Sequence, residues 1–387
     1  MRRRHNPRHI ALNGGAPISA ARLSVTGSGP EVRMSDLLSG TKPFEAPILA
    51  RSLGQVATSF GGFFITCAAA YVLLGVSVWT TPPLLLIAAG FLVRIFIIQH
   101  DCGHGSFLRS RRANNILGSI CSLVTLTPYT FWRRQHARHH GSWNNLDRRA
   151  ASGLDIYSSC VTVAEYLRLG SWRRRLYRLA YNPIVSHLML PPLVFLVLYR
   201  VPFDAANGWR RERRAVYLTD IALAGLIGGL GVMVGFGRMA AVQIPIMIVA
   251  SIIGVWLFSI QHRFETTSWA TDQDWNFTKA ALAGSSHLRL PRVLQWFSGN
   301  IGFHHVHHLS PRIPNYRLEE CHNTVPDLQS APTLTLRTAV GTLRHALWDE
   351  RLGRMVPFPE YHRGGSGNLA DSGIYADMHA RSKRGIK

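Results

Sequence analysis

The chain has 387 residues, 47% of them hydrophobic and only 17% charged, and its formal net charge is +22. So apolar a composition excludes an ordinary soluble enzyme and indicates an integral membrane protein. The positive charge lies in short arginine clusters beside apolar windows, so it favours anionic lipid headgroups as partners and argues against nucleic acid. The five cysteines include no C-x-x-C pair, so neither a zinc ribbon nor a disulfide framework is indicated.

The first part of the chain contains a flexible start and a pair of membrane-spanning windows. Residues 1–50 mix Arg, Gly, Pro and Ser without periodicity, which predicts a flexible basic N-terminal segment. Windows 56–79 and 82–99 approach or exceed the roughly 20 residues that cross a bilayer as a helix. The loop 101–180 contains RSRR, DRR and WRRRLYR, so the positive-inside rule places it in the cytoplasm and makes the two windows a hairpin.

The second half of the chain contains a further hairpin and one ambiguous window. Window 183–200 is apolar but proline-rich, and a full crossing would place GWRRERR at 208–214 outside, against the positive-inside rule. We therefore expect a re-entrant or interfacial segment there. Windows 216–236 and 240–261 are expected to form the second hairpin, which returns residues 262–387 to the cytoplasm.

These windows together predict an all-α integral membrane protein with about four transmembrane helices in two hairpins. Both termini and a helical cap are expected on the cytoplasmic side. The membrane-bound domain is predicted to cover residues 51–350, and the Gly-rich stretch 363–387 is predicted to be a flexible C-terminal tail.

Nine of the 18 histidines fall in three clusters, HDCGH at 100–104, HARHH at 136–140 and HHVHH at 304–308. Residues three and four apart share one side of a helix, so each cluster aims two or three imidazoles at one point. Eight imidazoles exceed the four ligands of a usual zinc site and suffice for two metals. The eight candidate ligands are His100, His104, His136, His139, His140, His304, His307 and His308.

The chemistry expected at a membrane helps to choose the metal. Imidazole binds iron, copper, zinc and nickel, so the ligands alone leave the metal open. An acyl chain presents unactivated methylene groups that no side-chain base can deprotonate, so an oxidising site is required, and redox-active iron fits where zinc does not. Paired histidines also arise by accident on exposed helices, which weakens HDCGH alone. A His-rich metal-transport loop would lack fixed spacing.

The residues around the histidines carry a family resemblance. The distinctive segments are HDCGHGSF at 100–107, FWRRQHARHHGSWNNLDRR at 131–149, QHRFETTSW at 261–269 and LPRVLQWFSGNIGFHHVHHLSPRIPNYRL at 290–318. Together they resemble the membrane-bound fatty acid desaturase family, and bacterial acyl desaturases in particular, over roughly residues 95–322.

The resemblance implies a four-span helical fold in the bacterial plasma (inner) membrane, with a cytoplasmic cap that holds a di-iron centre. It also implies an O2-dependent removal of two hydrogens from a fatty acyl chain. The eight histidines carry over as iron ligands. His262 in QHRFE matches a further ligand histidine of the family, and the alternative is that it only caps the fourth span.

Several polar residues near the boxes are candidates to support the ligands. Asn300 lies either near a metal-bound water or at the cap of the helix with the third box. His305 is offset by about 100° from its neighbour His304, which suggests a supporting or structural role. A carboxylate can accept the second ring N–H of a ligand histidine, or it can form a solvated salt bridge instead. The carboxylate candidates are Asp101, Asp147, Asp155 and Glu265.

The predicted function is that of a fatty acid desaturase that introduces a cis double bond, with two irons as cofactor and O2 as co-substrate. Electrons are expected from an external donor such as ferredoxin, because the chain contains neither H-P-G-G nor a Gly-rich dinucleotide fingerprint. The acyl group can be linked to lipid, CoA or carrier protein. A fatty acyl hydroxylase would use the same site. A divalent-metal transporter is less favoured, because the spans are almost free of ionisable residues apart from Asp220 and Arg94.

Overall fold

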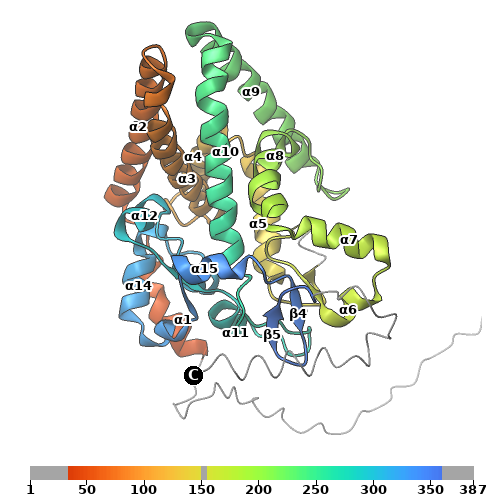
Figure 1. Ribbon diagram of the computed structural model, residues 1–387. Helices are drawn as coiled ribbons and strands as arrows, with labels where there is room; N and C mark the ends of the chain where they lie inside the picture. The colour runs from red at the N-terminus through yellow and green to blue at the C-terminus, as the bar shows by residue number, and fades with distance from the viewer. Residues whose placement is uncertain (1–33, 150–154, 360–387) are drawn as a thin grey trace, which may run out of the picture.

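The computed structural model describes residues 34–149 and 155–359, which are mostly helical (Figure 1). The helices are α1 (Met34–Thr41), α2 (Leu49–Leu74), α3 (Pro82–His104), α4 (Arg111–Thr125), α5 (Tyr129–Ser142), α6 (Val163–Arg168), α7 (Ser171–Ala180), α8 (Leu190–Leu196), α9 (Arg210–Val234), α10 (Phe236–Ile260), α11 (Phe277–Ala283), α12 (Arg292–Phe297), α13 (His304–Leu309), α14 (Leu318–Thr324) and α15 (Leu336–Thr342). Part of the predicted flexible segment 1–50 is helical, because it includes α1 and the start of α2. The predicted tail 363–387 lies outside the described residues.

Four of the described helices are long and apolar enough to cross a membrane, as the sequence predicts. They are α2, α3 with the turn that precedes it from Val78, α9 and α10. Each spanning segment has 25 to 27 residues, and a rise of about 1.5 Å per residue makes it longer than the roughly 30 Å hydrocarbon core. α2 stands beside α3 and α9 beside α10 as two hairpins (Figure 1). Their outer faces expose large apolar side chains such as Ile65 and Val232, as contact with lipid requires.

The apolar window at 183–200 is not one straight helix. It contains a π-helical turn (Val185–Met189), α8 and a 3-10 turn (Leu198–Arg200), and it is bent by 53° relative to α7. Pro191 and Pro192 lie in the first turn of α8, where N–H groups have no partner within the helix. The shape fits a re-entrant loop or a broken span, and a broken span would make the number of crossings five.

The protein is mostly helical, as predicted, and the described residues also include five short strands that the sequence did not predict. β1 (Val161–Thr162) pairs in parallel with β4 (Leu347–Asp349), which pairs in antiparallel fashion with β5 (Arg354–Val356). β2 (His287–Arg289) and β3 (Thr333–Thr335) form a parallel pair. Strands of two or three residues are too short to show the alternation by which a sequence predicts a strand.

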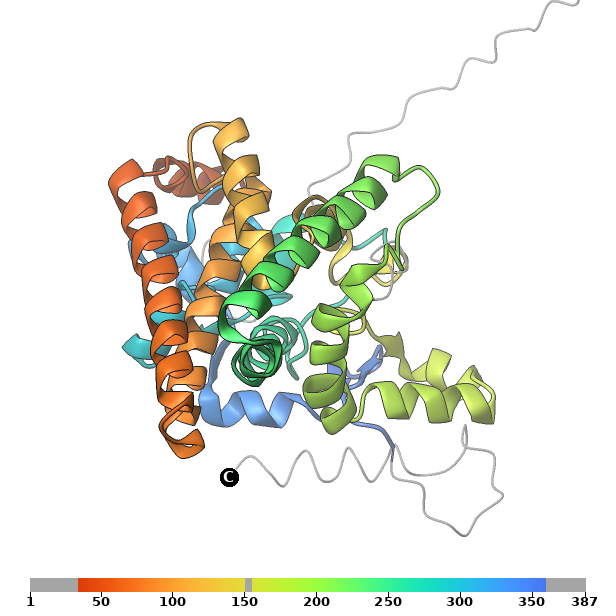
Figure 2. The ribbon, with the colours of Figure 1, turned by 90° about the horizontal axis from the view of Figure 1, so that it is seen from above.

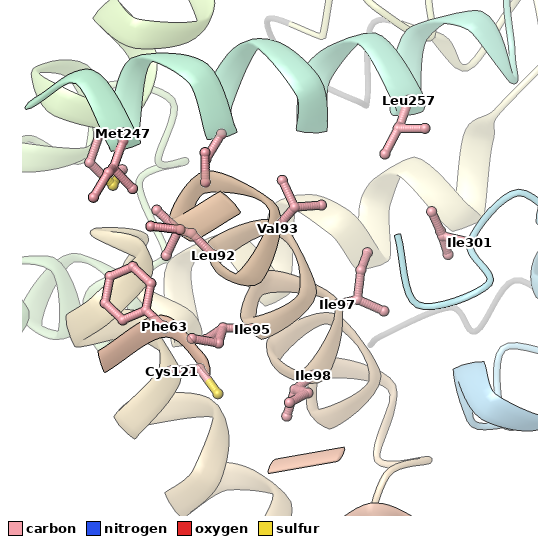
Figure 3. Close-up of a cluster of buried hydrophobic side chains, with 14 of the residues drawn as sticks. Phe63, Leu92, Val93, Ile95, Ile97, Ile98, Cys121, Met247, Leu257 and Ile301 are labelled. Carbon is pink, nitrogen blue, oxygen red and sulfur yellow. The ribbon is translucent and has the colours of Figure 1, made fainter. Parts of the chain in front are cut away.

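The main apolar core lies where α3 packs between α2 and α10 (Figure 3). Ile95 and Ile98 of α3 are fully buried there, with Phe63 of α2 and Met247 of α10 in the same cluster. Between lipid-embedded helices, close packing replaces the hydrophobic effect as the force of association. Gly62 illustrates this, because a Cβ atom added to it would lie 2.2 Å from the ring of Phe91 on α3.

The view from above shows how the remaining helices surround this core (Figure 2). α10 lies near the centre, between the pair formed by α2 and α3 on one side and the bent segment of α7 and α8 on the other. α3 contacts α5, and the residues just after α10 meet α13 where His262 lies against His304. This arrangement brings together the segments that carry the histidine clusters.

Candidate metal centre

The nine predicted ligand histidines come from four separate segments of the chain. His100 and His104 lie on the last turns of α3, which is capped by Gly105 with a left-handed backbone (φ +74°). Glycine adopts this conformation without strain, so it ends the helix directly after the first histidine pair. α5 carries the second cluster, the short helix α13 carries the third, and His262 follows the end of α10.

Five imidazoles form one convergent group. Their ligand nitrogens all lie within 4.8 Å of one another, and the members are His100, His104, His136, His140 and His307. The Nε2 atom of His136 lies 3.0 Å from Nε2 of His104 and 3.2 Å from Nε2 of His140. Nε2 of His307 lies 3.1 Å from Nε2 of His140. Residues from all three clusters therefore point their nitrogens at one place.

A second group contains His139, His262 and His308, whose ligand nitrogens are also within 4.8 Å of one another. His304 lies against this group, with its Nε2 atom 2.9 Å from Nε2 of His262 and 3.1 Å from Nε2 of His308. His262 directly follows Gln261, the cap residue of α10, so its position just beyond the helix end brings its ring to this group. All nine predicted ligands thus lie in or against one of the two groups.

The surroundings keep six of these imidazoles neutral. Burial, and after it the neighbouring imidazoles, hold the pKa well below its usual range for His136, His140, His262, His304, His307 and His308. A neutral imidazole has one N–H and one lone pair, and it is the form that binds metal ions. Where several ring nitrogens lie about 3 Å apart, neutral imidazoles have too few N–H groups to form a hydrogen bond between every pair. Metal cations between the rings would instead accept every lone pair. The residues therefore fit metal ions.

Two carboxylates contact ligand histidines. Asp101 Oδ1 lies 3.1 Å from Nδ1 of His100, while its Oδ2 accepts hydrogen bonds from the main-chain and side-chain nitrogens of Asn315 at 2.7 and 2.8 Å. Asp155 Oδ2 lies 3.6 Å from Nδ1 of His139 and accepts a hydrogen bond from the Ser158 hydroxyl. In His139 the contact is on the nitrogen opposite Nε2, which lies 3.4 Å from Nε2 of His308.

The pKa of Asp155 reflects this environment. Burial alone would raise the pKa of this carboxyl, but its contacts with His139 and Ser158 outweigh burial and hold the pKa below the ordinary value. The hydroxyl of Ser158 also lies 2.9 Å from Nδ1 of His139, so the ring has two oxygen neighbours on that side. Asp155 is therefore an anion that faces His139.

The other supporting candidates contact different partners. Asp147 accepts from the main-chain N–H of Asp272 at 2.7 Å, and Glu265 pairs with Arg354 at 2.7 Å. Asn300 bonds to Gln295 and to the main chain of Asn315. It does not cap α13, since the cap residue there is Phe303 and no side-chain cap bond forms. His305 points its Nε2 atom at Nδ1 of His322, at 3.0 Å, rather than at either histidine group.

An apolar cavity of about 490 Å³ borders both groups, a volume typical of pockets that hold small ligands. Its walls come mainly from α3, α5, α8 and α10, with Leu92, Phe96, Val194 and Met247 among the lining residues. Four histidines border it: His100, His136, His139 and His304. The cavity therefore joins a hydrocarbon-like space to the convergent imidazoles.

The sequence model of the fatty acid desaturase family matches residues 77–338, which is more than half of the chain. The chain belongs to the fatty acid desaturase family. A fatty acid desaturase of Bacillus subtilis (strain 168) is 42% identical to it over 315 residues, which cover 81% of this chain and 88% of that protein. The function predicted from the histidine clusters, that of an oxidoreductase acting as a fatty acid desaturase, is thereby confirmed.

More distant relatives carry more specific names. The sn-1 acyl-lipid omega-3 desaturase (ferredoxin) of Synechocystis sp. is 28% identical, over 70% of this chain and 74% of its own length. The sn-1 oleoyl-lipid 12-desaturase of Anabaena variabilis is 25% identical, over 78% of this chain and 83% of its own length. The matches therefore include several kinds of acyl-lipid desaturase.

Arg94 and Asp220, the two residues singled out within the apolar windows, are engaged in local contacts. Arg94 donates to the main-chain oxygen of Trp296 and lies over its ring at 3.9 Å. Asp220 pairs with Arg200 at 2.7 Å. These contacts fix side chains at helix packing sites, which is unlike the array of ionisable groups that would line a metal pathway.

Sequence reasoning missed three polar residues that contact the desaturase histidines or the aspartate beside them. Ser158 contacts His139, Asn315 contacts Asp101, and His322 contacts His305. None belongs to a spacing pattern, and each reaches its partner only through the fold. A search for polar residues within a few positions of the boxes would have found only residues close in sequence, such as Asp101.

Proposed function

We propose that this desaturase introduces a cis double bond into a fatty acyl chain at a di-iron centre held by nine histidines, with O2 as co-substrate. The observation that carries the proposal is that two convergent groups of imidazoles border one apolar cavity. The proposed ligands are His100, His104, His136, His139, His140, His262, His304, His307 and His308.

Iron is proposed because removal of hydrogen from an unactivated methylene group needs O2 and a redox-active metal. The bound iron pair would be that metal. The reaction balances when O2 takes up four electrons and leaves as two molecules of water. Two of these electrons, together with two hydrogens, come from the two C–H bonds that break, and the other two electrons come from an external donor with two protons from solvent. The residues of the chain hold the metals, position the acyl chain and exclude water.

The apolar cavity is the proposed site of the acyl chain. Its walls offer a methylene chain close packing and offer water few hydrogen bonds. Because His100 and His139 border the cavity, a chain inside it would lie beside both imidazole groups. The acyl-lipid names of the Synechocystis and Anabaena relatives favour a lipid-linked substrate over one linked to CoA or carrier protein.

Asp101 and Asp155 are proposed to set the tautomers of two ligands. Asp101 Oδ1 would accept the Nδ1 proton of His100, which leaves the Nε2 lone pair free for metal. Asp155, together with Ser158, would do the same for His139. Such contacts on the far ring nitrogen increase the basicity of a ligand and fix the plane of its ring.

The enzyme is proposed to lie in the bacterial plasma membrane with its histidines on the cytoplasmic side, where an electron donor and O2 are available. The arginine-rich loop after the first hairpin supports this orientation. A ferredoxin or similar protein is the proposed donor, and the name of the Synechocystis relative supports it.

The proposal is tested by product analysis. The chain is expressed with a ferredoxin system in a host of defined fatty acid composition, and new products are identified by mass spectrometry after derivatisation. We expect an alkene that is absent from cells with the empty vector, and iron in the purified protein. An alcohol would identify a hydroxylase instead, and an active preparation without iron would overturn the metal assignment.

The role of the cavity has its own test at Gly254 of α10. This glycine lines the cavity, and a Cβ atom added to it would meet no atom within 4 Å, so a larger side chain would extend into the cavity. We expect Gly254→Leu to change the accepted chain length or the double-bond position. Gly225→Leu, on an exposed part of α9 where an added Cβ is equally free, is the matched control and should leave the product unchanged.

A further inference from the structure

A second pocket, of about 560 Å³, lies against the five-histidine group and shares no lining residue with the apolar cavity. It is formed by the segment before α2, the turn between α3 and α4, and the residues after α13. The charged and ligand side chains that line it are Lys42, Glu45, His104, Arg109, Arg111 and Arg312. The two pockets thus differ in lining, one being apolar and the other cationic.

The four cations of this pocket are exposed, and none of them has an ion-pair partner among the described residues. Other cations of the protein are paired, as Arg200 is with Asp220 and Arg354 with Glu265. The one carboxylate of the pocket, Glu45, already accepts a hydrogen bond from Ser310 at 2.8 Å. Unpaired charges of one sign around a concave surface focus an attractive field on an anionic partner.

His104 connects this pocket to the metal centre. It is partly exposed and lines the pocket, while its Nε2 atom lies 3.0 Å from Nε2 of His136 within the five-histidine group. Its ring centroid also lies 4.7 Å from that of His140. A redox group brought to the pocket would therefore be separated from the proposed metals by a single imidazole.

The same geometry argues against an acyl head group in this pocket. A chain that starts here would have to pass through the imidazoles to enter the apolar cavity, and these rings are packed with centroids 4.4 Å apart for His100 and His307. The absence of shared lining residues leads to the same conclusion. Substrate and electrons would therefore approach the centre from different sides.

We propose that the cationic pocket formed by Lys42, Arg109, Arg111 and Arg312 is the docking surface for an acidic electron-donor protein of the ferredoxin type. His104 is the ligand closest to the docked donor, which delivers the two electrons of each turnover one at a time. This assignment rests on the proposed function, because only a redox enzyme of this kind needs such a donor.

The test uses the double charge reversal R109E/R312E in the full-length, iron-loaded enzyme in nanodiscs of neutral phosphatidylcholine. The probe is an acidic plant-type [2Fe–2S] ferredoxin, and both its affinity and the rate at which it reduces the enzyme are measured at low and high salt. We expect affinity and rate to fall by about tenfold or more at low salt, with loss of the salt dependence. R109K/R312K should retain wild-type values.

The matched control is R337E/R344E, which changes the net charge by the same amount. Arg337 and Arg344 are exposed, lie in or just after α15, and line neither pocket. We expect the control to bind ferredoxin as the wild type does. Equal losses in both double variants would overturn the docking assignment, because they would reflect net charge alone.

Two further measurements separate the remaining outcomes. Product formed by chemically reduced enzyme in a single turnover should be the same in R109E/R312E and wild type, because the acyl cavity is untouched. If wild-type enzyme formed no alkene under either condition, the proposed function would fail rather than the docking surface. If wild-type binding of ferredoxin were unaffected by the reversal and only binding to phosphatidylglycerol vesicles were lost, the pocket would be a lipid site.

Discussion

Two sets of histidines lie close together in this desaturase and differ in how their nitrogens are directed. In the two convergent groups, rings from different elements bring their Nε2 atoms to about 3 Å from one another. In the satellite set of His287, His305 and His322, the one close contact joins Nε2 of His305 to Nδ1 of His322, an ordinary donor and acceptor pair. Among the described residues, only the former gather three or more ligand nitrogens. The direction of the nitrogens, and not the number of histidines, marks a metal site.

Two adjacent residues of α13 belong to different histidine sets. His304 and His305 follow each other in α13 and are offset by about 100° around the helix. His304 therefore meets His262 and His308, while His305 turns toward α14 and meets His322. A helix of six residues thus divides its four histidines between the metal groups and the packing of the cap.

The largest effect is expected from the loss of a ligand in the convergent groups. His139→Ala should lower product formation by more than about 100-fold and reduce bound iron, because even the loss of a partner behind a ligand costs 10- to 100-fold. His345→Ala, at a histidine outside both sets, should retain product and iron. Gas chromatography of cellular fatty acids and metal analysis of purified protein provide the measurements. Wild-type activity in His139→Ala would contradict the ligand assignment.

A smaller effect is expected from the carboxylate behind that ligand. Asp155→Asn keeps the shape of the side chain but removes the anion beside Nδ1 of His139, and we expect activity to fall by about 10- to 100-fold with weaker iron binding. Asp147→Asn, in which the carboxylate meets the main chain of Asp272 instead, should be near wild type. The readouts are turnover and iron affinity in a chelator competition. Equal effects in the two variants would show that the contact of Asp155 with His139 has no specific role in activity or iron binding.

The contrast between Asp147 and Asp155 also shows which features of the site can be predicted from the sequence alone. The four spans and the three clusters could be predicted because hydropathy and helical spacing are local properties of the chain. The two aspartates are indistinguishable in that respect, since both follow the second cluster. Only the path of the chain after α5 decides which one meets His139, and that path depends on contacts with distant segments such as Asp272.

Other features of the fold could not be predicted for related reasons. The partner of His305 is His322, which lies in a helix with no recognisable motif. The strands β1 and β4 pair across nearly two hundred residues, and neither is long enough to show a pattern. In each case the determinant is a tertiary contact between residues that are individually unremarkable.

A still smaller effect on catalysis is expected in the satellite set. His305→Ala should leave iron content and product within about twofold, because this ring makes its contact with His322 rather than with a metal group. It should lower the free energy of unfolding by about 1–3 kcal/mol, since the buried partner loses its hydrogen bond. Thermal unfolding in detergent and metal analysis separate the two effects. Loss of iron in proportion to activity would instead place His305 among the residues that support the centre.

The smallest effect is expected from the pH dependence of His287. Burial, and after it the nearby His322 and Arg289, lower the pKa of this imidazole to about 4. Between pH 6.5, the ordinary pKa, and pH 4, this histidine binds a proton in the unfolded chain but not in the folded protein. Its contribution to the free energy of unfolding is therefore fully present above about pH 6.5 and declines as the pH falls toward 4. His287→Asn should flatten the fall in melting temperature between pH 7.5 and 5 without changing iron content. An unchanged slope would mean that other groups, and not this satellite histidine, carry the acid sensitivity.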